Sequence, residues 1–194
     1  MAFPIDFSFK KIALAPQIYV RNAQGNIVAY VKQKLFKLKE DISVFSDESQ
    51  STQRFRIQAD RIIDFSAKYT FTTANGQAVG GISRQGMRSI WRARYDIFGA
   101  QSQFVFQEEN GWIKVLDAVV SGVPVLGMFA GYFLNPTYLI VRAGSNLPVA
   151  RLRKMPAFWE GLFRLEAVGA ATDAEQDAIT LGCMTVLLLE RGRG

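Results

Sequence analysis

Histidine is missing from this chain of 194 residues, and cysteine occurs once, as Cys183. Without histidine, the sequence lacks both the commonest acid–base group near neutral pH and the commonest metal ligand. A single cysteine excludes an intrachain disulfide, and its position in an apolar run predicts a buried, unreactive thiol. These absences fit a protein of the reducing cytoplasm.

Familiar catalytic motifs are also missing. The chain contains no P-loop, no Gly-x-Gly-x-x-Gly, no Gly-x-Ser-x-Gly and no His-Glu-x-x-His. Ser83 lies one residue away from the nucleophile-elbow spacing, with no histidine to activate it. Asp60 and Asp64 could form a carboxylate pair, but we interpret them as part of a connection, paired with Arg61 or Lys68. We therefore expect no enzymatic activity, no catalytic residue, no metal site and no cofactor.

Signals for export or membrane insertion are weak. The N-terminal residues lack an early basic region, and Asp6 interrupts their apolar character, so no signal peptide is expected. Residues 118–141 carry no charge over 24 residues, which is long enough to cross a bilayer. Pro124 and Pro136 interrupt this stretch. We expect a short helix near residues 112–120 followed by buried backbone, and a membrane span stays open as the alternative.

The composition, with 49% hydrophobic and 21% charged residues, predicts one globular domain over residues 1–194. Its net charge of +6 is unevenly distributed. Residues 1–97 hold 15 Lys/Arg and 8 Asp/Glu, whereas residues 98–194 hold 8 and 9. A basic half could meet an anionic membrane, phospholipid headgroups or nucleic acid. The alternative is a surface that serves only solubility.

Three segments read as β-hairpins. Each has a strand that begins with apolar or aromatic residues, a turn rich in Gly and Asn, and a return strand that ends in a basic residue. Asn and Gly tolerate the positive φ that tight hairpin turns require. The hairpins span residues 18–32, 69–84 and 138–153, with turns at 22–26, 75–76 and 143–146.

Further strands are predicted by alternation of apolar and polar residues. In residues 91–97, Trp91, Ala93, Tyr95 and Ile97 share one face, and Arg92, Arg94 and Asp96 share the other. Strict period two over seven residues indicates a half-buried strand. The same pattern places on one face the pairs Phe104 and Phe106, Phe55 and Ile57, and the trio Phe163, Leu165 and Ala167.

The chain ends with a run from Ala178 to Leu189 that contains no charge. Thr172 with Glu175, or Asp173 with Gln176, has the spacing of a helix capping box. Twelve helical residues rise about 18 Å, against about 30 Å of bilayer hydrocarbon, so the run is too short to span a membrane comfortably.

We therefore predict a helix at Ala174–Leu189 that is buried around its whole circumference. Because the rest of the chain looks like strands, we expect a closed antiparallel β-barrel around this helix, with Gly182 at a close approach. The acidic residues at its start also suggest calcium binding, but no Asp-x-Asp-x-Asp-Gly loop accompanies them, so capping is the preferred interpretation.

Basic residues on the strands are the best candidates for a binding site. Lys32 and Lys34 share one strand face, and Lys37 and Lys39 have the other parity, so a bend near residues 35–36 is needed to aim all four together. Two arginine pairs at i, i+2 spacing each share a face. Arginine and lysine bind anionic headgroups by charge-assisted hydrogen bonds. Alternatively, these charges only prevent strand-edge pairing. The candidates are Lys32, Lys34, Lys37, Lys39, Arg92, Arg94, Arg151 and Arg153.

Several motifs in a fixed order resemble a known group. They are Lys32 to Ile42, Tyr69 to Arg84, Ser89 to Ile97, Leu134 to Tyr138, Pro148 to Lys154 and Phe158 to Glu166, followed by the apolar helix. Together they span roughly residues 20–190 and resemble the tubby-like superfamily, specifically its LURP-one-related and phospholipid-scramblase-like branch.

This resemblance implies a barrel of about 12 strands threaded by the C-terminal helix, and a non-enzymatic function. Tubby-type members bind phosphoinositides through basic residues on the barrel, and scramblase-type members are linked to calcium-dependent lipid movement. The scramblase calcium segment is not recognisable before this final helix, where only Thr172 to Asp177 stand. The cysteine cluster that is palmitoylated in scramblases is also missing.

We therefore expect a cytoplasmic binding or regulatory module, peripheral at the membrane, that contacts anionic lipid such as phosphoinositide through its basic half. Two alternatives stay open: a scramblase-like membrane-associated lipid-handling protein, and an adaptor that binds nucleic acid or another protein. Nucleic acid is the less favoured partner, because the aromatic residues mostly alternate inward and leave no evident stacking surface.

Overall fold

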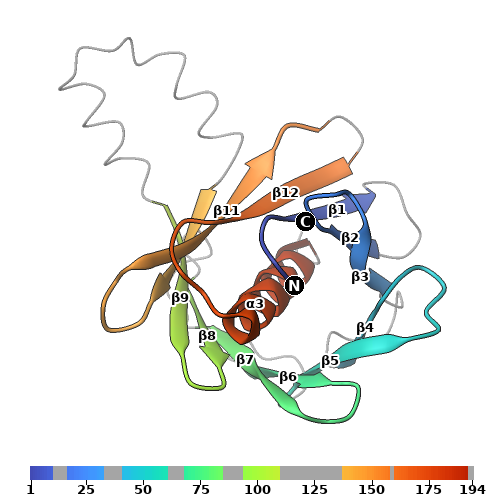
Figure 1. Cartoon of the computed structure of the whole chain (residues 1–194), viewed down its shortest axis with the longest axis horizontal. Coiled ribbons are helices and arrows are strands. Elements are labelled where there is room, and N and C mark those ends of the chain that lie inside the picture. Colours follow the sequence, from blue (N-terminus) through green and yellow to red (C-terminus); the bar gives the residue numbers. More distant parts are fainter. Residues whose placement is uncertain are drawn as a thin grey trace.

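The computed structural model describes residues 1–10, 17–32, 41–60, 68–84, 94–109, 137–157 and 160–191. Over these residues, twelve strands form one closed barrel around the helix α3 (Asp173–Arg191), as Figure 1 shows. The expected fold class is confirmed. The strands are β1 (Ile5–Lys10), β2 (Gln17–Arg21), β3 (Ile27–Lys32), β4 (Asp41–Phe45), β5 (Gln53–Ala59), β6 (Lys68–Thr73), β7 (Ala78–Arg84), β8 (Tyr95–Gly99), β9 (Gln103–Glu108), β10 (Thr137–Arg142), β11 (Pro148–Met155) and β12 (Glu160–Ala167).

Each strand pairs antiparallel with its neighbours in sequence, and β1 pairs with β12 to close the barrel. In this closing pair Ile5 lies opposite Leu165. Closure leaves no free sheet edge for other chains to pair with. The three predicted hairpins are confirmed as β2–β3, β6–β7 and β10–β11. Gly25, Gly76 and Gly144 lie in their turns with φ between 80° and 83°, a region that glycine enters without steric cost.

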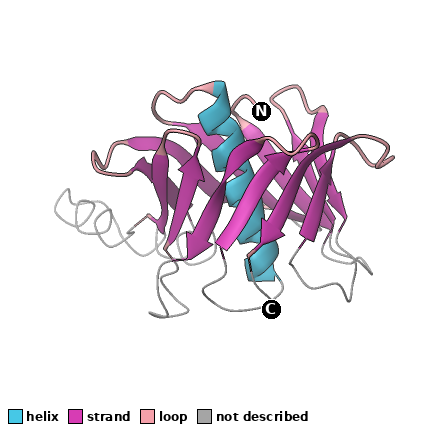
Figure 2. Ribbon diagram, turned by 90° about the horizontal axis from the view of Figure 1, so that it is seen from below, coloured by secondary structure: helices cyan, strands magenta, loops and turns pink. Residues whose placement is uncertain are grey.

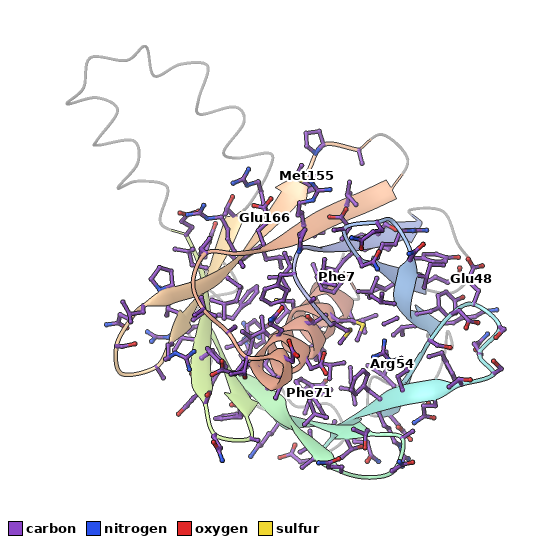
Figure 3. All side chains as sticks on the ribbon, in the orientation of Figure 1. Phe7, Glu48, Arg54, Phe71, Met155 and Glu166 are labelled. Carbon is purple, nitrogen blue, oxygen red and sulfur yellow. The ribbon has the colours of Figure 1, made fainter. Side chains whose placement is uncertain are left out.

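The interior is filled by the inward residues of alternate strand positions, as the sequence predicts. Figure 3 places Phe7 and Phe71 inside the ring of strands, beside the helix, and both are fully buried. Tyr95 and Ile97 are buried as expected, whereas residues 91–93 of the same predicted strand lie outside the described residues. Ala167 is exposed, because it is the last residue of β12, at the rim of the barrel.

Some aromatic residues are buried on the outer wall. Tyr19 and Tyr30 alternate with the core residues Val20 and Val31, so their side chains point away from the interior. They face each other across β2 and β3, with ring centroids 5.1 Å apart, and are 6% and 3% exposed. Inward alternation therefore does not account for every buried aromatic side chain.

The helix begins with the predicted capping box. The Glu175 amide donates to Thr172 Oγ1 at 3.3 Å, and the Thr172 amide donates to Glu175 Oε2 at 2.8 Å. The alternative cap between Asp173 and Gln176 is not formed: Gln176 Oε1 accepts from the Phe3 amide at 2.9 Å, and Gln176 Nε2 donates to the Ala171 carbonyl at 3.2 Å. The helix extends to Arg191, two residues past the predicted end, because Glu and Arg continue a helix as readily as Leu does.

All residues of α3 from Ala178 to Leu188 are buried. The hydroxyl groups of Thr180 and Thr185 donate to the carbonyls one turn earlier, so these polar groups are satisfied within the helix. A methyl group placed on Gly182 would lie 2.7 Å from Ile97 Cδ1. The expected close approach at Gly182 is therefore confirmed, and it is made to β8.

The barrel has two distinct ends (Figure 2). We call the end at which α3 begins the upper end; it contains residues 22–26, 46–52, 74–77, 100–102, 143–147 and 168–172. We call the opposite end the lower end; it contains the strand termini Lys10, Gln17, Lys32, Asp41, Ala59, Lys68, Arg84, Tyr95, Glu108, Thr137, Met155 and Glu160.

Candidate functional site: basic residues at the lower end

Four of the eight predicted binding residues fall within the described part of the chain. The other four, Lys34, Lys37, Lys39 and Arg92, lie outside the described residues. The bend that would aim the lysines of residues 32–39 together also lies outside them.

Three of the four described candidates are exposed at or near the lower end. Lys32 is the last residue of β3, Arg94 immediately precedes β8, and Arg153 lies in the lower half of β11. Among the described residues, none provides an ion pair or side-chain hydrogen bond to any of these three groups. Their charges are therefore available to an anionic ligand.

Arg151 has a different environment. Its Nη2 donates to Glu109 Oε1 at 3.2 Å, and the Glu109 side chain is only 10% exposed. The pair lies on the outer wall, spanning β10 between the end of β9 and β11. Arg151 and Arg153 share a strand face, as predicted, but Arg151 already has a carboxylate partner. A buried Glu109 needs this partner, because an unpaired carboxylate is costly away from water.

The exposed candidates do not form one compact cluster. Going round the barrel, β8 and β11 are three strands apart, and β11 and β3 are four strands apart through β12, β1 and β2. Neighbouring strands lie about 4.8 Å apart, so these separations are about 14 and 19 Å along the sheet. Arg94, Arg153 and Lys32 are therefore spread around the lower rim.

Lys68 is a further exposed lower-end cation, which sequence reasoning had treated only as a partner of Asp60. It opens β6, and its Nζ lies 5.1 Å from the centroid of the Phe98 ring. Its amide, rather than its side chain, donates to Asp60 Oδ1 at 3.0 Å. Asp64 lies outside the described residues. The sequence did contain a signal for Lys68. Lys68 stands at the start of the hairpin β6–β7, and Lys32 stands at the end of the hairpin β2–β3, so both residues lie at the open end of their hairpins, opposite the turns.

The upper end uses its charges internally. Glu175 accepts from Arg142 Nη1 at 2.6 Å and from Ser102 Oγ at 2.5 Å, in addition to its cap contact. The hydrogen bond from Arg142 is the main reason that the pKa of Glu175 falls to about 2; burial opposes it. Asp177 forms an ion pair with the amino group of Met1. These acidic groups therefore hold the helix start in place.

Over the residues that the structure describes, the Cys, Asp and Glu side chains form no group of three or more that could hold a metal ion. No helix among these described residues combines the length and the hydropathy that a membrane span requires. The expected short helix near residues 112–120 lies outside the described residues, and so do residues 118–136 of the uncharged stretch 118–141. The last five residues of that stretch, 137–141, belong to strand β10. The Cys183 thiol is buried, and burial raises its pKa.

The closed antiparallel barrel around the buried helix α3 defines the structural class of this protein. A sequence profile of the LURP-one-related family matches residues 27–166, and the chain belongs to this family. The match confirms the resemblance drawn from the motifs. The matched region runs from β3 to β12. Strands β1 and β2, which complete the barrel, and the central helix α3 lie outside it. Comparison with curated proteins and with solved structures found no match.

Proposed function

We propose that this protein is a non-enzymatic binding module that contacts anionic phospholipid through the basic residues of its lower end. The observation that supports the proposal is the exposure of Lys32, Arg94 and Arg153 without an ion-pair partner among the described residues. A cation that is already paired must give up its partner to bind phosphate, whereas these three keep their full charge for a ligand. Phosphate oxygens accept charge-assisted hydrogen bonds from both side chains, and arginine can donate two at once.

The spacing of these cations bears on the kind of lipid site. Separations of about 14 Å or more exceed the size of one headgroup, so several lipids are contacted at once. Such binding follows the anionic charge density of the surface. A phosphoinositide, which carries several phosphates, is the strongest single ligand for each cation. In this proposal the protein acts peripherally, at the cytoplasmic face of a membrane.

Co-sedimentation with liposomes tests the proposal. Three vesicle compositions are used: neutral phosphatidylcholine, phosphatidylcholine with phosphatidylserine, and phosphatidylcholine with a phosphoinositide at matched total charge. We expect sedimentation with both anionic compositions and none with the neutral one. Equal sedimentation with all three compositions, or none at low salt, would contradict lipid binding.

Two triple variants with the same net charge test whether vesicle binding depends on the lower-end residues or only on the total charge of the protein. Lys32→Gln, Arg94→Gln and Arg153→Gln together lower the net charge by three. Gln24→Glu, Gln77→Glu and Ser145→Glu lower it equally, and these three residues are exposed in upper-end turns. We expect only the first variant to lose vesicle binding, with both retaining the circular dichroism of the wild type.

The two alternatives give different results in the same assays. An adaptor for nucleic acid would bind an oligonucleotide more tightly than vesicles and lose that binding steeply with salt. A scramblase-like protein would need detergent for purification. Either outcome would replace the proposed function.

A further inference from the structure

Four exposed basic residues are distributed around the whole circumference of the lower end. Lys32 ends β3, Lys68 begins β6, Arg94 precedes β8 and Arg153 lies near the end of β11. Around the ring of twelve strands, the steps between these positions are three, two, three and four strands. No side of the barrel therefore lacks such a residue, and no side contains all four.

This distribution determines how the barrel must be oriented for all four basic residues to contact one flat surface. A plane laid along the wall of a barrel touches strands on one side only. A plane laid across the lower end approaches all twelve strand termini at once, and so all four cations. A bilayer is such a plane, whereas a small anionic ligand would reach one or two of these residues.

The turns of the upper end carry the opposite charge. They contain no Lys or Arg, and their two charged residues are Asp47 and Glu48. Three arginines lie at strand ends here and are engaged: Arg142 pairs with Glu175, Arg54 donates to the Val28 carbonyl at 2.6 Å, and Arg21 donates to Ser8 Oγ at 2.5 Å. Glu48 is exposed, and Figure 3 places it at the outer margin of the ring.

Among the described residues near the lower end, Lys32, Lys68, Arg94 and Arg153 are exposed cations, and Asp41, Asp60 and Glu108 are exposed carboxylates. Asp41 forms a two-point ion pair with Arg56, at 2.8 and 2.6 Å, and the buried Glu109 pairs with Arg151. The four exposed cations outnumber Asp60 and Glu108, so the exposed charge of the described residues at this end is positive.

We infer that the barrel docks end-on, with its lower end against an anionic bilayer and its axis close to the membrane normal. The inference rests on the proposed lipid binding and adds the orientation to it. Six strand residues span about 20 Å along the strand, which is about 15 Å along the axis of a barrel whose strands tilt by about 40°. This distance exceeds the Debye length of about 10 Å at 0.1 M salt, so the upper-end carboxylates are largely screened from the surface in this orientation. Inverting the barrel would bring them against lipid of like charge.

Single neutralisations test the symmetry of the contact. Lys32→Gln, Lys68→Gln, Arg94→Gln and Arg153→Gln each remove one positive charge from a different side of the rim. Each basic residue near an anionic leaflet is worth about fivefold in affinity, so we expect all four variants to lower the vesicle partition coefficient by about that factor. Gln24→Glu and Gln77→Glu, which change the net charge equally at the upper end, should leave it unchanged.

Site-specific fluorescence tests the orientation directly. Cys183 is buried, so a single introduced cysteine can be labelled with an environment-sensitive dye. Pro156 is exposed just beyond the lower end of β11, whereas Gln24 and Ser145 are exposed in upper-end turns. With phosphatidylserine vesicles, we expect a blue shift and an intensity gain for Pro156→Cys, and no change for Gln24→Cys or Ser145→Cys. Ser43→Cys, on the wall of β4, should also stay unchanged.

The outcomes separate this inference from the proposed function. Vesicle binding that depends on one or two neighbouring cations, or a response from the label at Ser43, would show side-on contact and overturn end-on docking while lipid binding stands. A response at Gln24 or Ser145 would overturn it as well. If no vesicle composition binds the protein, or if an oligonucleotide binds in place of vesicles, the proposed function and the orientation fail together.

Discussion

Single residues hold this molecule together at places where two elements touch closely. Gly182 faces Ile97 of β8, and Glu175 joins α3 to Arg142 and Ser102. Position 182 requires a residue without a side chain. Position 175 requires a carboxylate, which accepts hydrogen bonds from groups more than 30 residues away in the sequence.

Replacing Gly182 by leucine should destabilise the protein by roughly 1–3 kcal/mol or more, because the added side chain enters space that Ile97 fills. Urea unfolding followed by circular dichroism measures the change. Ala174→Leu, at an exposed position of the same helix, is the control and should be nearly neutral. On an exposed helix, losing glycine would instead raise stability by up to about 1 kcal/mol, so a more stable Gly182→Leu variant would contradict the burial of this face.

Glu175 should make stability depend on pH in acid solution. Its pKa of about 2 lies below the ordinary value of 4.5, so its contribution is complete above pH 4.5 and is lost as the pH falls toward 2. We expect wild type to lose on the order of 1–3 kcal/mol more stability than Glu175→Gln between pH 5 and pH 2. Parallel urea titrations at both pH values test this. Equal losses in the two proteins would show that the Arg142 contact does not stabilise the fold.

At the scale of elements, the helix and the strands depend on each other. The inward residues of the barrel form one hydrophobic core with residues of α3, and the helix is buried from Ala178 to Leu188. A helix of this length would be marginal alone in water, so tertiary packing supplies most of its stability.

Deleting residues 173–194 removes α3, so it should leave the apolar interior of the barrel without the helix that packs in it. Loss of a whole buried helix far exceeds the few kcal/mol that single large-to-small substitutions cost, so we expect an aggregating product. Size-exclusion chromatography and thermal unfolding of the truncated chain measure this. A soluble monomer with a cooperative transition would show that the barrel does not need its helix.

At the scale of the whole molecule, the charge separation between the two ends matters most. The cations of the lower rim belong to strands that are distant around the ring, and the turns of the upper end contain no basic residue. If long-range attraction to anionic lipid dominates binding, the affinity for vesicles should fall steeply as salt rises from 50 to 300 mM, because the Debye length shortens from about 14 to about 6 Å. Binding that is insensitive to salt would point to apolar insertion instead.

Much of the fold could be predicted from local sequence. The turns of β2–β3, β6–β7 and β10–β11 depend on Gly and Asn within a few residues, and period-two alternation identified the inward residues Phe55, Ile57, Phe104 and Phe106. The capping box of α3 is likewise a contact over three residues. These features need no knowledge of distant segments.

The candidate site could be predicted only in part. Lys32, Arg94 and Arg153 are exposed, as their strand parity indicates, but Arg151 is paired with Glu109, 42 residues away in the sequence. Alternation tells which side of a strand a residue faces and not which distant group it meets. It also missed the outer-wall pair of Tyr19 and Tyr30, whose burial comes from neighbours across the sheet.

The sequence by itself determined the strands, the turns, the capped apolar helix and the family of this protein, because each rests on periodicity, on short-range contacts or on motif order. The tertiary structure alone decided that β1 closes against β12, that Gly182 meets Ile97, and that the exposed cations encircle one end of the barrel. The physical reason is that closure fixes the position of every strand around the ring and along the axis. The distance between two residues on different strands, and whether they lie at the same end of the barrel, are therefore set only when the ring is closed.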